Sequence, residues 1–232
     1  RLYGHVSARE PYSVARWLAD VRAVLDEAAR DGLLTVVVGG TGLYFKALLE
    51  GLSPIPEVPA EIRAHWRRRA VTEGAAVLHA ELVALDPVTA ARLGPTDTQR
   101  LTRALEVLAA TGRSLADWQA EPGEPLLPEA ETERVVVTRP RAELHTRADR
   151  RFDLMMAEGA LDEVRGLVAL GLAPDAPAMQ ALGVPALAAH LAGEMSLEEA
   201  VARGKVQTRQ YIKRQETWLR RNMMTWLVEQ PQ

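Results

Sequence analysis

The apolar positions near the start of the chain repeat with the period of an α-helix. Between Val14 and Ala28 they follow one another at intervals of three and four residues, which places them on one helical face. Ser13 stands directly before this pattern as a suitable N-cap, and Asp31-Gly32 follows it as a stop signal. The pattern therefore predicts a helix over residues 13–30.

The next apolar positions are continuous instead of periodic. Residues 33–38 read Leu-Leu-Thr-Val-Val-Val, and an unbroken run of this kind is typical of a strand buried on both faces of a parallel sheet. The glycine turn, which we define as Gly39 to Gly42, then leads into a second helical pattern over residues 43–49. Helix, buried strand, glycine turn and helix together make up an α/β unit.

Two proline-rich stretches, residues 53–59 and 122–128, divide the chain further. Prolines are poor within helices and common in linkers, and the pattern between the two stretches is helical throughout. We therefore expect an α/β core over 1–56, an inserted helical subdomain over 57–125 that is hinged at both ends, and a second core part with C-terminal basic helices over 126–232. The alternative is that the two stretches are ordinary loops of one domain.

A second buried strand is predicted over residues 134–138, and the pattern from Ala142 onward is helical. Two strands are too few for an independent parallel sheet, since sheets hold about five or six strands on average. The other strands are therefore either missing from the chain or not recognisable in it. The chain does not begin with Met, and we expect the missing strands upstream.

The composition of the chain mainly excludes certain classes of protein and of site. The hydrophobic content of 47% suffices for a sizeable core, and the net charge of −3 requires any anionic partner to be met by local basic clusters. The absence of cysteine excludes a disulfide framework, a zinc–thiolate site and a cysteine nucleophile. No apolar run of about 18 residues occurs, so no membrane span is expected. The five histidines lack the close spacing of metal ligands.

The glycine turn is the first candidate for chemistry. Its glycines let backbone approach a small polar substrate, and the N-terminus of the following helix offers free N–H groups to an anion. Thr41 adds a hydroxyl. The turn is neither a Walker A loop nor a G-x-G-x-x-G fingerprint, and no P-loop occurs elsewhere in the chain. A tight structural turn explains this sequence equally well.

A helix start in the expected insertion is the second candidate. Thr96 and Gln99 form the pattern of a capping box, and Arg100 and Arg103 share one face of the helix that follows. These arginines either aim at a phosphate or a base, or are solvated or paired with Glu106.

Arginines gather in two further places. They crowd residues 63–69, either as a solvated face or as a grip on an RNA backbone. Arg147 and Arg151 stand one helical turn apart, and arginine side chains hold phosphate or diphosphate through two hydrogen bonds. The alternative for this pair is ion pairing with Asp149 or Asp153.

The last predicted helix has the strongest concentration of charge. Between Arg203 and Arg221, seven basic residues stand against one acid, Glu216. Tyr211 and Trp218 are interleaved with them, which suits stacking on splayed bases. The alternative is that these aromatic residues anchor the helix in the core, and both interpretations can hold on different faces.

Four strings, in this order and spacing, resemble those of the tRNA dimethylallyltransferase (tRNA isopentenyltransferase) family. They are Gly39–Tyr44, Leu48–Leu52, Asp97–Arg100 with Arg103–Glu106, and Lys213–Trp218. The resemblance covers essentially the whole chain. It implies transfer of a dimethylallyl group from dimethylallyl diphosphate to the N6 amine of adenine-37, beside the anticodon of tRNA. It also implies a P-loop NTPase-like parallel-sheet core, incomplete here, with an inserted all-helical tRNA-binding subdomain and a helical C-terminal part.

The resemblance further implies roles for single residues. Thr41 and Arg151 would be catalytic, with Thr41 near the flipped adenine and Arg151, helped by Arg147, on the diphosphate. Contacts to tRNA would come from Thr41, Arg63, Asp97, Thr98, Gln99, Arg100, Leu101, Gln180, Gly183, Lys213, Arg214, Gln215, Thr217, Trp218 and Arg220. Magnesium is expected on the diphosphate. The expected protein is a monomer of the cytoplasm that binds the anticodon stem-loop.

The sequence departs from the family pattern in one major respect. The family places its catalytic base on an upstream aspartate, beside a P-loop whose lysine holds the diphosphate, and neither is in this sequence. We expect an N-terminal portion of the intact protein to carry both, and this chain alone to be inactive without it. A milder departure is Leu182-Gly183-Val184, where many members have Gly-Tyr.

Two other functions stay open at this point. One is a non-catalytic tRNA-binding fragment, which would need only the helical insertion and the basic helix. The other is a P-loop kinase-like phosphotransferase, suggested by the α/β pattern alone. The string Lys213–Trp218 argues against this second alternative, because a small-molecule kinase has no use for an anticodon clamp.

Overall fold

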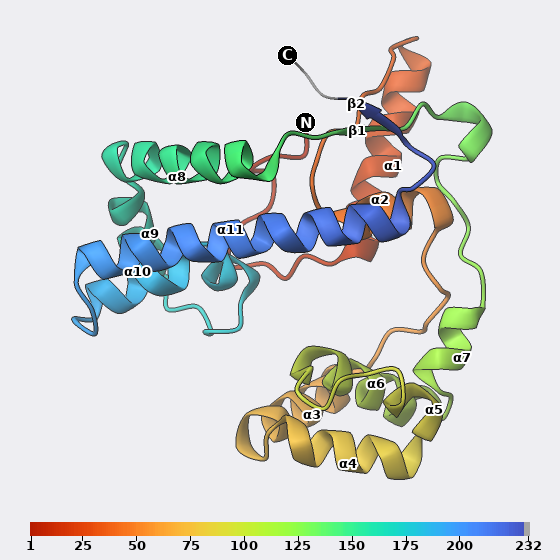
Figure 1. The fold of residues 1–232 in the computed structure, drawn as a ribbon. Helices are drawn as coiled ribbons and strands as arrows, with labels where there is room; N and C mark the ends of the chain where they lie inside the picture. Colours follow the sequence, from red (N-terminus) through yellow and green to blue (C-terminus); the bar gives the residue numbers. More distant parts are fainter. Residues whose placement is uncertain (230–232) are drawn as a thin grey trace. The chain divides into compact units, whose positions relative to one another are not determined.

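The computed structural model describes residues 1–229 and shows a helix-rich α/β protein with a small parallel sheet (Figure 1). The chain divides into two compact units, which we call the sheet unit and the helical unit. The sheet unit comprises residues 1–48 and the chain from Leu127 on, and the helical unit comprises residues 49–126. No helix in the described part is both long and apolar enough to cross a membrane.

The first predicted helix is confirmed. Helix α1 spans Val14–Arg30, and the hydroxyl of Ser13 accepts a hydrogen bond from the Arg16 amide as the N-cap. Its apolar face buries Trp17 and Val21. The Trp17 ring stacks on Tyr44 of α2 (Gly42–Glu50), with 4.4 Å between ring centroids, so the second predicted helix also forms and packs against the first.

The predicted buried strand over residues 33–38 is wrong. The segment belongs to no strand, and four of its five apolar side chains are exposed, Leu34 at 92%. A strand needs a neighbouring strand to supply hydrogen-bond partners for its backbone, and no strand in the described part of the chain lies beside this segment. The apolar composition of the run was therefore not sufficient to predict its burial.

The second predicted strand forms, and it finds a partner that the sequence pattern did not reveal. Strand β1 (Val135–Val137) pairs in parallel with β2 (Leu227–Glu229), with Val135 opposite Leu227 (Figure 1). The expectation that β1 is buried is wrong, since Val137 is 64% exposed. Two strands of three residues leave both faces open to solvent. The short apolar run that forms β2 was hidden at the end of a long helical pattern.

Four helices and two short 3-10 turns make up the rest of the sheet unit. They are α8 (Arg141–Ala157), α9 (Ala160–Ala169), the 3-10 turn η2 (Pro177–Gln180), α10 (Val184–Leu191) and α11 (Leu197–Asn222); a further 3-10 turn, η1 (Glu129–Glu131), precedes β1. Helix α11 lies alongside α8 and α10 (Figure 1). It begins with a capping box, in which the Ser196 hydroxyl accepts from the Glu199 amide and the Glu199 carboxylate accepts from the Ser196 amide.

Helices α8 and α11 run antiparallel and are joined by three ion pairs. Arg141 bonds Glu216 at 2.7 Å, Asp149 bonds Arg209 at 2.7 Å, and Asp153 bonds Lys205 at 2.6 Å. Between these helices the buried ring of Phe152 packs against two glycines. A Cβ on Gly183 would stand 3.0 Å from that ring, and one on Gly204 would overlap it. The close packing of α8 against α11 therefore depends on glycine at position 204, and its packing against the start of α10 depends on glycine at position 183.

The helical unit contains α3 (Ala60–Thr72), α4 (Ala75–Leu85), α5 (Pro87–Ala90), α6 (Thr98–Thr111) and α7 (Leu115–Ala120). Its core consists of buried side chains from several helices, among them Trp66, Leu78, Leu82, Leu101 and Leu105. The two connections at its ends touch each other, because the backbone of Gly51 lies against that of Gly123. Gly51 has a φ of +75°, and a Cβ there would stand 2.6 Å from the Gly123 carbonyl carbon.

The predicted capping box at the start of α6 is wrong. The N-cap is Asp97, whose carboxylate accepts a hydrogen bond from the Arg100 amide at 3.2 Å. An aspartate satisfies a free amide at the helix start as a threonine does, and its charge also favours the positive end of the helix dipole. The helix consequently begins one residue later than the box predicts.

A buried carboxylate ties α5 to α7. The side chain of Asp86 is almost fully buried and accepts hydrogen bonds from the Thr89 amide at 3.0 Å and from the Ser114 hydroxyl at 2.7 Å. Burial alone would raise the pKa of Asp86, but the hydrogen bonds from Thr89 and Ser114, with the charge of Arg92, outweigh it and hold the pKa below its usual value. The native helical unit therefore favours the ionised form of Asp86.

We expect Asp86→Ala to lower the free energy of unfolding of the helical unit by about 2–3 kcal/mol, because it removes a cap and leaves buried donors unpaired. Asp86→Asn should remove the part of the pH dependence of the free energy of unfolding that comes from this carboxylate. A lowered pKa gives stability that is present at neutral pH and is lost as the pH falls below about 4, where the unfolded aspartate takes up a proton. Denaturant unfolding at pH 7 and pH 3 checks both changes, with the exposed Asp117→Ala as control. If the free energy of unfolding fell by the same amount from pH 7 to pH 3 in the wild type and in Asp86→Asn, this role of Asp86 would be contradicted.

Candidate functional site

The glycine turn and the C-terminal basic helix meet in the sheet unit. The side-chain amide of Gln215 on α11 donates a hydrogen bond to the Gly40 carbonyl at 2.7 Å. The Trp218 ring, one turn further along, lies directly against Gly42, and a Cβ on either glycine would overlap the α11 side chain facing it. The glycines are therefore required by the close approach of α11. Two strings far apart in the sequence thus form one site.

Thr41 lies at the exposed edge of this contact. Its carbonyl accepts a hydrogen bond from the Tyr44 amide at 2.9 Å, as the first turn of α2 begins. Its side chain is exposed, and within the described residues the hydroxyl makes no hydrogen bond. The hydroxyl is thus available to a bound substrate beside the end of α11.

The last turns of α11 line a shallow hollow of about 500 Å³. It is lined by Lys213, Arg214, Thr217, Trp218, Arg221 and Asn222. Arg221 and Asn222 were not predicted as site residues, although each stands four positions after a predicted residue, Thr217 or Trp218, and so shares its helical face. The hollow combines three cationic side chains with the side chain of Trp218, which suits an anionic aromatic ligand such as RNA.

The ion pairs of α11 separate its structural charges from its free ones. Lys205 and Arg209 are bound to α8, and Glu216, the one acid between Arg203 and Arg221, is neutralised by Arg141. Lys213 and Arg214 are exposed, and no ion pair in the described part of the chain engages either of them. The positive charge available to a partner is therefore concentrated beside the glycine turn.

The aromatic residues of α11 fit the anchoring alternative better than free stacking. Trp218 is half-buried against the glycine turn. Tyr211 is also half-buried, and the Arg214 guanidinium lies over its ring at 5.6 Å from the centroid. The hydroxyl of Thr217 donates to the Lys213 carbonyl at 2.8 Å, and the exposed Arg220 donates to the carbonyl of Glu216.

Arg147 and Arg151 lie one turn apart on α8, and both are exposed. Arg147 is 3.6 Å from the Glu143 carboxylate. Arg151 makes no hydrogen bond or ion pair within the described residues, and Asp149 and Asp153, two positions before and after it, are bound to α11. No hydrogen bond or ion pair within residues 1–229 joins either arginine to the glycine turn. Arg151 is thus a free cation on the same unit as that turn.

Two predicted positions near η2 have local structural roles. The side-chain amide of Gln180 is at the surface and donates a hydrogen bond to the Pro174 carbonyl at 2.6 Å. Gly183 is buried with a φ of +90° and packs against Phe152. Any contribution of Gly183 to RNA binding would therefore come through its backbone and the packing of α10.

The predicted positions of the helical unit differ in their exposure. Thr98, Gln99 and Arg100 are exposed at the start of α6, and the Arg100 guanidinium is 3.2 Å from its cap, Asp97. Leu101, in contrast, is 0% exposed and belongs to the core. Its side chain has no surface to offer RNA, and it positions α6 instead.

The side chain of Arg63 on α3 is held by a hydrogen bond to a backbone carbonyl. Its guanidinium donates to the Val58 carbonyl at 2.9 Å, and the carboxylate of Glu57 is 4.0 Å away. The side chain is still partly exposed. The remaining donors of its guanidinium can therefore reach a partner without breaking this contact.

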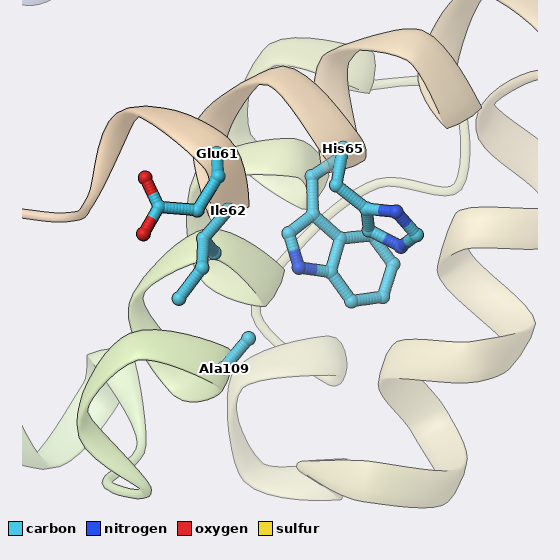
Figure 2. Close-up of a pocket in the computed structure, with 5 residues that line it drawn as sticks. Glu61, Ile62, His65 and Ala109 are labelled. Atoms are coloured by element: carbon cyan, nitrogen blue, oxygen red, sulfur yellow. The ribbon is translucent and has the colours of Figure 1, made fainter.

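A second shallow hollow, of about 380 Å³, lies on the helical unit (Figure 2). It is lined by Glu61, Ile62, His65, Trp66 and Ala109. Figure 2 shows Glu61 and His65 on opposite sides of the hollow, with Ile62 between them. No arginine or lysine lines it, so it does not suit a phosphate, and we do not include it in the candidate site.

The described residues contain no group of three or more His, Asp or Glu side chains that could hold a metal ion. Arg147 and Arg151 suit the anionic diphosphate itself.

The comparison with protein families gives a match over nearly the whole chain. The model of a family described as IPP transferase matches residues 1–222. A tRNA dimethylallyltransferase of Azorhizobium caulinodans is 50% identical over 231 residues, which cover 100% of this chain and 74% of the relative. That of Mesorhizobium japonicum is 51% identical over 226 residues, covering 96% of this chain and 69% of the relative.

Solved structures agree with this match. The full-length tRNA isopentenylpyrophosphate transferase from Bacillus halodurans has a TM-score of 0.64 at 29% identity, covering 99% of this chain and 70% of that one. A eukaryotic dimethylallyltransferase acting on tRNA has a TM-score of 0.71 at 25% identity, covering 93% of this chain and 54% of that one. The family resemblance predicted from the four strings is thus confirmed, and the chain belongs to the IPP transferase family.

Proposed function

We propose that this protein transfers a dimethylallyl group from dimethylallyl diphosphate to the N6 amine of adenine-37 in tRNA, next to the anticodon. The observation that carries the proposal is the contact between α11 and the glycine turn. It puts free cations suited to an RNA backbone beside an exposed hydroxyl and a tight backbone turn suited to a small substrate. The names of the relatives support the same activity.

The proposed reaction is an alkyl transfer with allylic cation character. The N6 lone pair of adenine forms a bond to C1 of the dimethylallyl group, while the bond between C1 and the diphosphate oxygen breaks and its electron pair leaves with the diphosphate. Arg151, assisted by Arg147, would stabilise the charge that develops on this leaving group. The proton lost from N6 goes to a general base, which we assign to the upstream aspartate implied by the family resemblance.

Access to the amine requires the adenine to leave its stack. A stacked base hides its exocyclic group, so the target nucleotide must be flipped out toward the site. We assign Thr41 to the flipped adenine, because its hydroxyl is exposed beside the basic hollow. In this proposal Lys213, Arg214, Gln215, Thr217, Trp218 and Arg220 hold the anticodon arm, together with Gln180, Gly183 and, on the helical unit, Arg63 and residues 97–100.

Three further assignments belong to the proposal. The core is assigned to the P-loop NTPase-like class, and magnesium is assigned to the diphosphate substrate. The protein is assigned as a monomer acting in the cytoplasm. These assignments rest on the family resemblance.

The test is transfer of labelled dimethylallyl from its diphosphate to an anticodon stem-loop, with this chain measured beside a version extended upstream. Transfer by the extended version alone supports the mechanism as written. Transfer by this chain alone would place the base and the whole diphosphate site within these residues and overturn our assignment of the base. Binding of the stem-loop without transfer by either version would favour a non-catalytic tRNA-binding protein.

Substitution of the free cations beside the turn should change how RNA affinity depends on salt. We expect Lys213→Ala and Arg214→Ala each to weaken binding of the stem-loop and to reduce the steepness of the plot of log affinity against log salt by about 0.7–1. The reason is that a variant with one phosphate contact fewer releases fewer counterions from the RNA when it binds. Filter binding at several salt concentrations checks this. Arg203→Ala, an exposed basic residue at the other end of α11, is the control and should leave the slope unchanged. An unchanged slope in the first two variants would make this end of α11 structural.

A further inference from the structure

A buried carboxylate in the helical unit joins two arginines from different helices. The Glu106 side chain on α6 is only 6% exposed. Its oxygens lie 3.6 Å from the Arg67 guanidinium on α3 and 3.5 Å from the Arg103 guanidinium on α6. The arginines themselves face solvent, Arg67 at 59% and Arg103 at 43% exposure. The negative charge is thus covered by the protein, and the two positive charges are outside it.

This arrangement leaves both guanidinium groups with unused donors. A guanidinium carries five N–H groups, and each of these two has Glu106 as its single ion-pair partner within the described residues. Because one carboxylate holds both groups, they are kept close together without being saturated. A phosphodiester oxygen pair is the ligand that matches two adjacent outward-facing guanidinium groups.

Neighbouring arginines extend the pair along the same surface. Arg63 precedes Arg67 by one turn on α3, and Arg100 precedes Arg103 by about one turn on α6. Helices α3 and α6 pack against each other within the helical unit. Arg63 and Arg67 thus share a face of α3, Arg100 and Arg103 share a face of α6, and Glu106 joins the two helices at Arg67 and Arg103.

We propose that Arg67 and Arg103 grip a backbone phosphate of the RNA, and that Glu106 is the positioning residue that holds the two guanidinium groups at the spacing this grip requires. The proposal rests on the proposed function, since it names a further contact for the same RNA. It adds Arg67, Arg103 and Glu106 to the residues that recognise it. Glu106 acts through the arginines and does not touch the RNA.

The decisive variant is Glu106→Gln, because two explanations predict opposite signs. Removing the carboxylate raises the net charge at these arginines by one, so arginines that acted only as charges would bind the stem-loop more tightly. If Glu106 positions them, binding weakens despite the added positive charge. We expect a loss of roughly tenfold, the size of one charge-assisted hydrogen bond. Tighter binding by Glu106→Gln would overturn the proposal.

Arg67→Ala and Arg103→Ala provide the second measurement, because each leaves Glu106 one arginine partner and so preserves the fold. Each should weaken binding of the stem-loop roughly tenfold and lower the salt slope by about 0.7–1. Arg68→Ala is the matched control, since Arg68 is exposed on the same helix and makes no ion pair in the described part of the chain. It should change neither quantity. Circular dichroism and thermal unfolding of all variants identify any that do not fold.

The outcomes separate this proposal from the proposed function. If Lys213→Ala and Arg214→Ala weaken RNA binding while Arg67→Ala and Arg103→Ala do not, the arginine grip is wrong and the proposed function stands. If the wild-type chain does not bind the stem-loop at all, both are wrong. If Glu106→Gln does not fold, the two arginine variants decide, because their salt slopes report phosphate contacts directly.

Discussion

Replacing Arg151 with alanine is expected to slow dimethylallyl transfer by about 10²–10³-fold, the usual loss when one preorganised group that stabilises developing charge is removed. The affinity for the anticodon stem-loop should change by less than about twofold. Arg151 is exposed and carries no ion pair within the described residues, so its removal breaks no fold contact there. The loss should therefore appear in the transition state, where negative charge builds up on the departing diphosphate.

Single-turnover transfer by the version extended upstream, at saturating RNA and over a range of dimethylallyl diphosphate concentrations, measures this effect. Arg150→Ala is the matched control, because it removes an equal charge from an exposed neighbouring position on α8. Arg151→Lys should recover only part of the rate, since an ammonium keeps the charge without the two-pronged hydrogen bonding of a guanidinium. A rate for Arg151→Ala equal to that of wild type at saturating RNA would remove Arg151 from the diphosphate site.

Gly42→Ala is expected to impair both RNA binding and transfer, with a loss of stability of about 1–3 kcal/mol, as for other substitutions that overfill a packed site. The added Cβ would overlap the Trp218 ring. The end of α11 must then move away from the glycine turn, and the hydrogen bond from Gln215 to Gly40 would be strained or lost with it. Because the proposed site is formed by this contact, both of its functions should fall together.

A double-mutant cycle of Gly42→Ala and Trp218→Ala, measured by denaturant unfolding and by stem-loop binding, checks whether the overlap with Trp218 causes these losses. Trp218→Ala makes room for the new methyl group, so Gly42→Ala should cost much less in that background, and the two effects should not add. Gly166→Ala is the control: Gly166 lies inside α9, and a Cβ added there would have no atom within 4 Å, so alanine should stabilise by about 0.5–1 kcal/mol. Additive losses at Gly42 and Trp218 would show that the contact does not carry the effect.

The parts of this fold that could be predicted are those whose signals all lie within one short stretch of the sequence. The helix at Val14–Arg30 was predicted because its period, its cap and its stop signal all lie within one short stretch of the chain. The exposure of residues 33–38 could not be predicted, because burial depends on neighbouring strands that a sequence pattern does not report. Strand β2 was missed for the same reason, since three residues become a strand only when β1 lies beside them.

The candidate site shows the same limit at the level of single charges. The sequence identified the basic end of α11, but it could not separate Lys205 and Arg209, which α8 neutralises, from Lys213 and Arg214, which are left available among the described residues. Arg100 and Leu101 are neighbours in one string, yet one is at the surface and the other is in the core. Only the three-dimensional pairing of side chains distinguishes a charge available to RNA from one used for packing.

The contact between Gly51 and Gly123 has a consequence for engineering and for evolution. The backbone enters and leaves the helical unit at nearly the same point. A short peptide joining these two glycines would therefore close the unit into a ring, and the entropic cost of closing so short a loop would be small. New termini could then be opened in a surface loop, giving a circular permutant with the same packed core. Such adjacency is also what allows a whole folded module to be gained or lost in a single insertion event without rebuilding its host.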